Sequence, residues 1–113
     1  MRFHVEADNR VIEESWDNPA PFGLIFDRHV DEIFLFVARR VPRQDAPDLT
    51  ADVFERALRS RHRYDPSYRS ALPWLRGIAR NVIGEYLKSR HRSQRTQGQE
   101  IPLGFETDRK SVV

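Results

Sequence analysis

The sequence of 113 residues contains no cysteine, which excludes disulfide bonds, thiolate zinc sites and a cysteine nucleophile. It contains no apolar run near the roughly 18 residues that a membrane-spanning helix needs. No glycine-rich phosphate loop, HExxH motif or GxSxG motif occurs. The four histidines, His4, His29, His62 and His91, are scattered without a partner at metal-binding spacing, and His29 lies on an apolar stripe typical of a packed core. We therefore expect a protein that is not an enzyme and holds no metal or cofactor.

The first ten residues, MRFHVEADNR, do not have the basic-then-apolar pattern of a secretory signal. Together with the absence of a membrane span, this predicts a soluble, cytoplasmic protein that does not bind a membrane. The length is that of one ordinary domain, with little room for a second hydrophobic core.

Apolar residues recur at helical spacing in three segments, about 19–41, 46–61 and 71–91. A shorter apolar stripe predicts a helix over about 9–17, and a strand over 3–5 is compatible with the pattern. We therefore predict an all-α fold, a compact bundle of three main helices plus a short N-terminal helix.

Side chains suited to capping helices precede the three long segments: Asn18, Asp45 and Ser70. Within the predicted bundle, residues 1–8 form an N-terminal extension and 9–92 the helical domain. The rest, 93–113, loses the helical period and is predicted to be a linker or disordered tail.

Charge is distributed unevenly along the chain. Residues 56–95 contain eleven basic and two acidic side chains, a net charge of +9, whereas the remainder carries −7. Such a division favours one surface for a polyanion and another for a basic partner. For the basic residues alone, a solvated helical surface with scattered ion pairs is an equally good explanation.

Aromatic residues among these basic ones favour nucleic acid, because single strands are held by cationic tracks for phosphates and aromatic faces for bases. Asn81 adds an amide that can donate to and accept from a base edge. The alternative for the aromatic residues is that they cap the hydrophobic core. The mixed stretch comprises Arg61, Arg63, Tyr64, Tyr68, Arg69, Trp74, Arg76 and Arg80.

Three segments together resemble region 2 of the extracytoplasmic-function (ECF) sigma factors, the promoter-recognition subunits of bacterial RNA polymerase. They are DRH at 27–29, DAPDLTADVFERAL at 45–58 and YRSALPWLRGIARNVIGEYLKSRHR at 68–92. Their order and spacing match, and the resemblance covers about 9–92. It implies a helical domain that docks on core polymerase and recognises and melts the minus-ten promoter element.

In that family, the helix with the DLTxxVF pattern docks on the coiled coil of the largest polymerase subunit. Many relatives carry glutamine where Ala51 stands, so one polar contact is expected to be missing here. The alternative for Asp48 is that it complements the helix dipole. Carried over by position, the resemblance implies a polymerase-binding set of Asp48, Leu49, Asp52, Val53, Glu55 and Arg56.

The loop 63–70 matches the part of the family that takes a flipped base of the non-template strand into a pocket. Trp74 matches an aromatic at the junction of duplex and melted DNA, and Asn81 a position near the flipped base. Arg76, Arg80, Lys88 and Arg92 would follow phosphates. The implied DNA-binding set is Arg61, Arg63, Tyr64, Tyr68, Arg69, Ser70, Trp74, Arg76, Arg80, Asn81, Lys88 and Arg92.

Two other functions fit the same residues. One is a helical protein-interaction module that holds a regulator such as an anti-sigma factor, and the other is a general basic DNA-binding domain that works without polymerase. Relatives continue into a second helical domain that reads the minus-thirty-five element. The sequence ends inside what resembles the linker, which fits both an excised domain and a naturally short protein.

Overall fold

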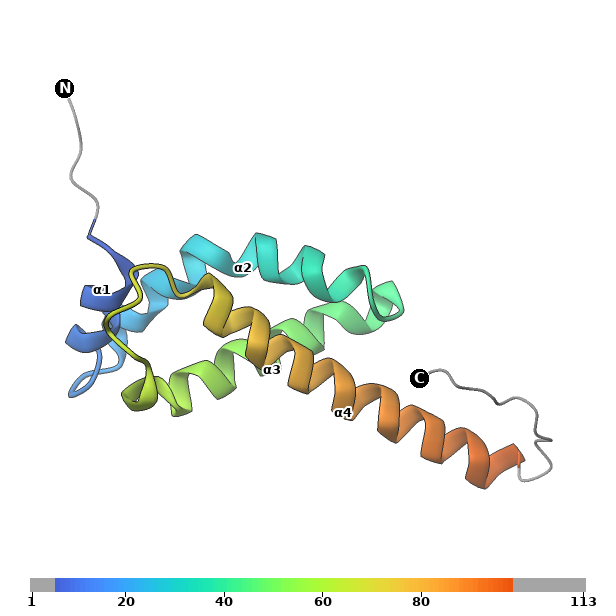
Figure 1. The fold of residues 1–113 in the computed structure, drawn as a ribbon. Coiled ribbons are helices and arrows are strands. Elements are labelled where there is room, and N and C mark those ends of the chain that lie inside the picture. Colours follow the sequence, from blue (N-terminus) through green and yellow to red (C-terminus); the bar gives the residue numbers. More distant parts are fainter. Residues whose placement is uncertain (1–5, 99–113) are drawn as a thin grey trace. The chain divides into compact units, whose positions relative to one another are not determined.

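The computed structural model describes residues 6–98, with side chains for 6–93, and no strand occurs within that range. The predicted all-α fold, with three main helices and one short N-terminal helix, is confirmed (Figure 1). The strand considered at 3–5 lies outside the described residues. The helices are α1 (Asp8–Glu14), α2 (Gly23–Ala38), α3 (Ala46–Arg59) and α4 (Leu72–Gly98), and the short 3-10 helices are η1 (Ala20–Phe22), η2 (Arg43–Asp45) and η3 (Arg61–Arg63).

The ends of the helices differ from the predicted ones. The second predicted helix is divided at its start, because prolines at 19 and 21 place a 3-10 turn before α2. The first helix ends at Glu14, where the Ser15 hydroxyl donates to the Ile12 carbonyl at 2.6 Å. The last helix continues beyond Arg92 to Gly98, into the stretch predicted to be a linker.

Of the three predicted caps, Ser70 bonds the start of α4, where its hydroxyl accepts from the Leu72 amide at 3.2 Å. The Asn18 side-chain oxygen accepts from the Ala20 amide at 3.2 Å, in the turn before η1. It does not cap α2, which begins at Gly23 with Phe22 at its N-cap and no side-chain capping bond, so that prediction is wrong. Asp45 stands at the N-cap of α3, but its side chain makes no capping hydrogen bond. Its backbone is already helical there, whereas a capping side chain reaches the helix amides from an extended backbone, so this prediction is wrong.

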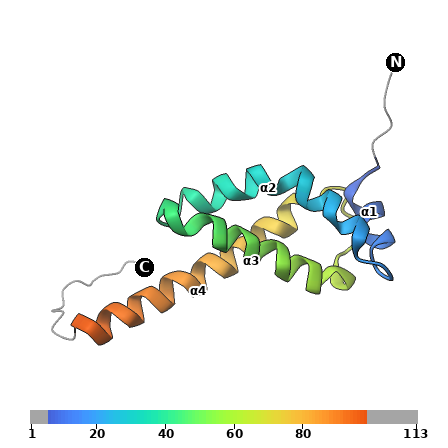
Figure 2. The same ribbon diagram turned by 180° about the vertical axis from the view of Figure 1, so that it is seen from behind.

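The chain divides within α4 into one unit that ends at Ile83 and another that begins at Gly84. In the first unit, α2 and α3 lie side by side and run antiparallel, joined through η2 (Figures 1 and 2). Each helix contributes large side chains to the core, and full burial of one stabilises the fold by roughly 1.5–3 kcal/mol. The largest fully buried apolar side chains are Val11, Ile12, Ile25, Ile33, Val37, Val53, Leu75 and Val82.

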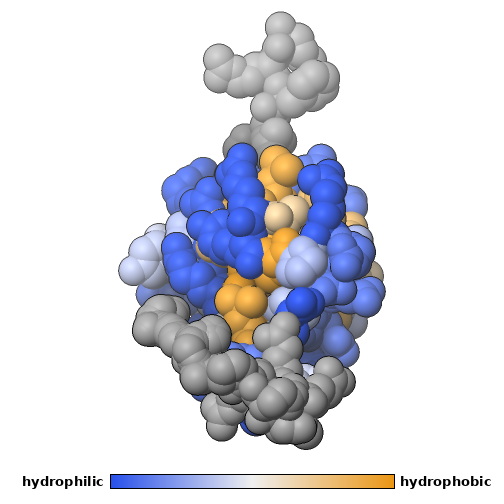
Figure 3. Space-filling view, turned by 90° about the vertical axis from the view of Figure 1, so that its right-hand side faces the viewer, coloured by the Kyte–Doolittle hydropathy of each residue, from blue (hydrophilic) through white to orange (hydrophobic). Residues whose placement is uncertain are grey.

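The surface mixes charged and apolar side chains. Figure 3 shows a strip of hydrophobic surface bordered by hydrophilic side chains. Leu24, Phe26 and Leu35 of α2 each keep more than 40% of their area exposed. Over residues 6–98, none of the helices combines the length and the apolar composition that crossing a bilayer requires.

Candidate functional site

The loop between η3 and α4 is held in place by the buried side chain of Tyr64. This side chain is only 4% exposed. Its hydroxyl donates to the carbonyl oxygens of Tyr68, at 2.6 Å, and Ser70, at 3.1 Å. Its ring packs edge-to-face on Trp74, with centroids 5.0 Å apart. Tyr64 therefore fixes the far half of the loop to the start of α4.

The sequence-based role of Tyr64 as a surface for a nucleic-acid base is wrong, since a buried ring cannot stack on a ligand. The local pattern of tyrosines beside arginines does not reveal which ring turns inward. Tyr64 is held by two carbonyls and Trp74, whereas Tyr68 is 62% exposed. The loop thus presents one open tyrosine ring, Tyr68.

Burial makes the ionisation of Tyr64 measurable. Desolvation, with repulsion from the Asp8 and Asp65 carboxylates, raises the pKa of Tyr64 from 10.0 to about 12. Because the folded pKa lies above the unfolded one, the stability from the neutral phenol is complete below pH 10 and is lost as pH rises toward 12. We expect the protein to lose about 2–3 kcal/mol of unfolding free energy over that range.

Urea unfolding at several alkaline pH values tests this expectation. Tyr64→Phe should lack the alkaline loss, and Tyr68→Phe, which changes an exposed tyrosine, should keep it. An alkaline loss of equal size in wild type and Tyr64→Phe would contradict the assignment.

The loop is also held from outside by α1, which lies beside it although the two are far apart in sequence (Figure 1). The Asn9 amide nitrogen donates to the Pro66 carbonyl at 2.7 Å, and the Ala71 amide donates to the Asp8 carboxylate at 2.7 Å. Within the loop, the Asp65 carboxylate accepts from the Ser67 amide at 2.9 Å. The backbone is therefore tethered on both sides of Tyr68.

Asp8 is the centre of a buried polar cluster that the sequence did not reveal. Its side chain is 6% exposed and lies 2.8 Å from the Arg28 guanidinium and 2.7 Å from the His29 ring. Burial opposes ionisation, but hydrogen bonds from Ala71, Arg28 and His29 outweigh it and hold the pKa of Asp8 below its ordinary value. The cluster joins α1, α2 and the start of α4. The only hint in the sequence is the Arg28–His29 pair in DRH.

His29 is partly buried, and its ring bonds Asp8 rather than a ligand. Over the part of the chain that the structure describes, no group of three or more histidine, cysteine, aspartate or glutamate side chains could hold a metal ion.

Arg61, predicted to contact DNA, makes several hydrogen bonds within the fold. Its guanidinium donates to the carbonyl oxygens of Ser15 and Leu58, both at 2.8 Å, and lies 3.4 Å from that of Trp16. A basic sequence pattern alone does not distinguish an arginine that bonds the carbonyls at a helix end from an arginine that binds phosphate. Arg61 thus joins the ends of α1 and α3, and because it is partly exposed its DNA-binding role stays a prediction.

The other predicted DNA-binding residues keep at least part of their side chains at the surface. Trp74 is half-buried, and Arg76 pairs with Glu32 of α2 at 2.8 Å. Arg80 lies with its guanidinium carbon 5.5 Å from the centroid of the Phe36 ring. The exposed members in the first unit are Arg63, Tyr68, Arg69, Ser70, Arg80 and Asn81.

In the second unit, taken by itself, Lys88 and Arg92 are exposed. Their spacing of four residues places them on one face of α4.

The predicted polymerase-binding residues of α3 fall into two groups. Val53 is fully buried in the core, so its side chain cannot meet a partner, and its place in the binding set is corrected. Its burial follows from the helical period, which puts it on the inner face. Asp48 and Glu55 are exposed, whereas Leu49, Asp52 and Arg56 are partly exposed.

Two of the acidic residues on the exposed side of α3 form ion pairs with arginines one turn later in the same helix. Asp52 lies 3.3 Å from Arg56, and Glu55 lies 2.6 Å from Arg59. Pairs of this exposed i, i+4 type contribute about 0.3–0.5 kcal/mol, so a stronger partner can displace them.

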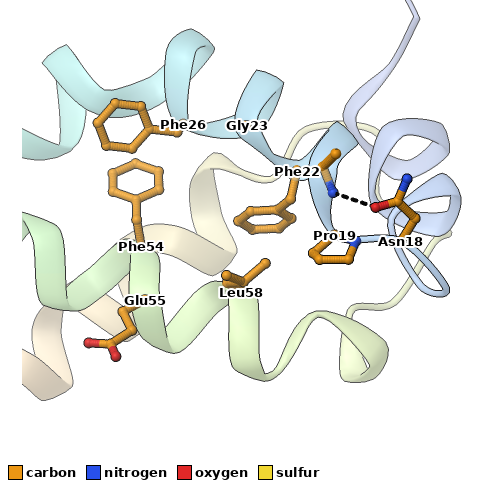
Figure 4. A pocket seen from close by; sticks show the side chains of 9 residues that line it. Asn18, Pro19, Phe22, Gly23, Phe26, Phe54, Glu55 and Leu58 are labelled. Carbon is orange, nitrogen blue, oxygen red and sulfur yellow. Dashed lines mark hydrogen bonds between the residues drawn. The ribbon is translucent and has the colours of Figure 1, made fainter.

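An apolar groove beside this face was not predicted. It has a volume of about 610 Å³ and lies between the start of α2 and the C-terminal half of α3 (Figure 4). Phe26 and Phe54 meet there edge-to-face, with ring centroids 5.0 Å apart, and Glu55 lies at its rim. Phe26 keeps the helical spacing of a core residue, but 41% of it is exposed. The remaining lining residues are Asn18, Pro19, Ala20, Phe22, Gly23 and Leu58.

Comparison with known proteins identifies the family. The family profile described as Sigma-70 region 2 matches residues 25–93. The chain belongs to the sigma-70 region 2 family. Among curated proteins, it is similar to the ECF RNA polymerase sigma factor BldN of Streptomyces coelicolor, with 35% identity over 82 residues. The alignment covers 71% of the chain but 31% of that relative.

Family membership gives the described surfaces their context. The sigma region 2 match includes most of α2, all of α3 and most of α4, and with them the loop that carries Tyr68. It begins after α1, so Asp8 and Asn9 lie outside it. The residues that hold the loop of this sigma region 2 domain from outside thus come from a part of the chain that the family match does not reach.

Proposed function

We propose that the chain acts in transcription initiation, as a sigma factor domain that docks on core RNA polymerase through α3 and recognises the minus-ten promoter element through the loop 63–70 and α4. The observation that carries this proposal is the tethered loop with one exposed aromatic ring, Tyr68, between the exposed Arg63 and Arg69. This combination suits an unpaired base with its phosphates. The domain works by binding, without catalysis, alongside the cytoplasmic polymerase.

Two features of the α3 surface support docking on a polymerase helix. Asp48, Asp52 and Glu55 offer carboxylates to a basic partner, and the groove beside them offers apolar contact. An interface of this kind has an apolar centre and a polar rim. The coiled coil of the largest polymerase subunit, implied by the family resemblance, is the partner that we propose.

The free energies involved indicate that this domain melts promoter DNA together with polymerase and not alone. Unstacking a base costs a few kcal/mol, and an aromatic platform returns about 1–3 kcal/mol per base. The two nearly cancel, so opening DNA needs phosphate contacts and polymerase as well. Exposed arginines such as Arg69 and Arg80 can make the contacts with phosphates. Because these contacts are electrostatic, binding to DNA is expected to weaken steeply as the salt concentration rises.

Two substitutions test whether the polymerase and DNA surfaces are separate. Asp52→Lys reverses a charge on α3, and we expect it to weaken binding to core polymerase by about tenfold or more, with single-stranded DNA binding retained. Asn81→Ala removes an exposed amide from α4, and we expect it to weaken binding to minus-ten oligonucleotides several-fold, by roughly one hydrogen bond, with polymerase binding retained.

Fluorescence anisotropy with labelled oligonucleotides and with the isolated polymerase coiled coil measures both effects. Glu13→Lys, an equal charge reversal on the exposed side of α1, is the matched control. Failure of the wild-type chain to bind the coiled coil would refute the proposed function.

A regulator such as an anti-sigma protein is a second candidate partner, and the open groove at Phe26 and Phe54 favours it. A chain that acted only as such a module would hold the regulator but show no affinity for minus-ten oligonucleotides.

A further inference from the structure

Two consecutive residues of α1 hold the loop on both sides of its exposed part. Asn9 binds the Pro66 carbonyl and Asp8 binds the Ala71 amide, each at 2.7 Å. Between these anchors lie residues 67–70, all exposed, including Tyr68. After the Asp65–Pro66 turn, a ligand can reach the loop only at residues 67–70, because Ala71 is buried. The two anchors lie on either side of this segment.

A third anchor acts from the inside on the same segment. The Tyr64 hydroxyl binds the carbonyls of Tyr68 and Ser70. With Tyr64 below and α1 beside it, the backbone that carries the Tyr68 ring is held at Pro66, Tyr68, Ser70 and Ala71. A binding group positioned on several sides loses less conformational freedom when the ligand arrives.

We propose that Asn9 is a positioning residue for base recognition, and that it sets the base preference of the loop by fixing the turn at Pro66. The inference rests on the proposed function, since it needs the loop to read a base. Asn9 touches no DNA in this mechanism. It acts through the backbone that leads to Tyr68.

The two α1 anchors differ in what their loss would do. Asp8 is buried and also bonds Arg28 and His29, so its removal disturbs the whole domain. Asn9 is partly exposed, and its side chain otherwise accepts only a local bond from the Arg10 amide at 2.9 Å. Asn9 is thus the anchor whose removal loosens the loop while the domain stays folded.

The test assembles the chain on bacterial core RNA polymerase and selects from single-stranded DNA randomised over the minus-ten element. Enrichment of each base at each position is the readout, because unfolding of part of the sample lowers binding to all sequences equally and leaves base ratios unchanged. Asn9→Ala removes the donor and the acceptor. Asn9→Asp keeps the acceptor for Arg10 and replaces the donor to Pro66 with a carboxylate oxygen, which cannot donate. Glu13→Ala is the matched control on α1.

We expect wild type and Glu13→Ala to enrich one base at the position read by the loop, and Tyr68→Ala to abolish that enrichment. Both Asn9 variants should lower the enrichment there by about threefold to tenfold, the range set by loss of one hydrogen bond, with unchanged affinity for polymerase.

If Tyr68→Ala loses the base preference and both Asn9 variants keep it, the inference is overturned while the proposed function stands. If the Asn9 variants weaken all sequences equally, or if only Asn9→Ala has an effect, the Pro66 anchor does not set the preference. If wild type binds polymerase but enriches no base, the proposed function fails, and the inference fails with it.

Discussion

Replacing Asp8 with alanine is expected to lower the free energy of unfolding by about 3–5 kcal/mol, as for removal of one partner of a buried ion pair. The substitution strips the Arg28 guanidinium, the His29 ring and the Ala71 amide of their shared acceptor. Urea unfolding followed by circular dichroism measures the loss. Glu13→Ala, on the exposed side of the same helix, should change the stability by less than about 0.5 kcal/mol.

The same cluster predicts a dependence on acid. The pKa of Asp8 is lower in the folded protein than in the unfolded chain, so its contribution is complete above the unfolded pKa of about 3.9. The contribution is lost as pH falls through the folded pKa. The difference in stability between wild type and Asp8→Asn should therefore shrink below about pH 4. A difference that stays constant down to about pH 2 would contradict the ionised state of Asp8.

Placing a charge in the apolar groove is expected to have the largest effect on polymerase binding. Leu58 lines the groove from α3 and is half-buried, so Leu58→Asp puts an unpaired carboxylate into the proposed contact surface, which would have to exclude water. We expect binding to the coiled coil of the largest polymerase subunit to weaken by at least about 30-fold, the scale of an interface hot spot.

Leu35→Asp is the matched control, because Leu35 is an exposed leucine of α2 that does not line the groove. Titration calorimetry with the isolated coiled coil compares the two variants, and urea unfolding verifies that both remain folded. If both substitutions weaken binding to the coiled coil equally, or if neither weakens it, the groove takes no part in docking.

The helices were predictable because their apolar residues recur at the period that packing requires. Ile33 and Val37 on α2, and Leu75 and Val82 on α4, are buried as the spacing indicated. The ends were less predictable, since local contacts decide them: the prolines at 19 and 21 delay the start of α2 to Gly23. At Asp45 the favoured residue type was present without the backbone geometry that capping needs.

The site was predictable only where exposure follows from position on a helix or loop. Tyr68, Arg80 and Asn81 are exposed as expected. Arg61 was not predictable, because its partners are the carbonyls of Ser15 and Leu58, which any residue type provides. Asp8 was not predictable either, because its partners come from α2 and from Ala71, the residue before α4, and depend on the tertiary fold.

If the loop reads promoter DNA as proposed, its tethering by α1 limits how far that preference can be transferred between relatives by exchanging the loop alone. A graft of residues 63–70 into a sigma factor would carry the Tyr68 ring but leave behind the contacts of Asn9 with Pro66 and of Asp8 with Ala71. The transferable unit is therefore discontinuous in the gene. On the proposed role of Asn9, a chimera designed to exchange recognition needs the first turn of α1 together with the loop.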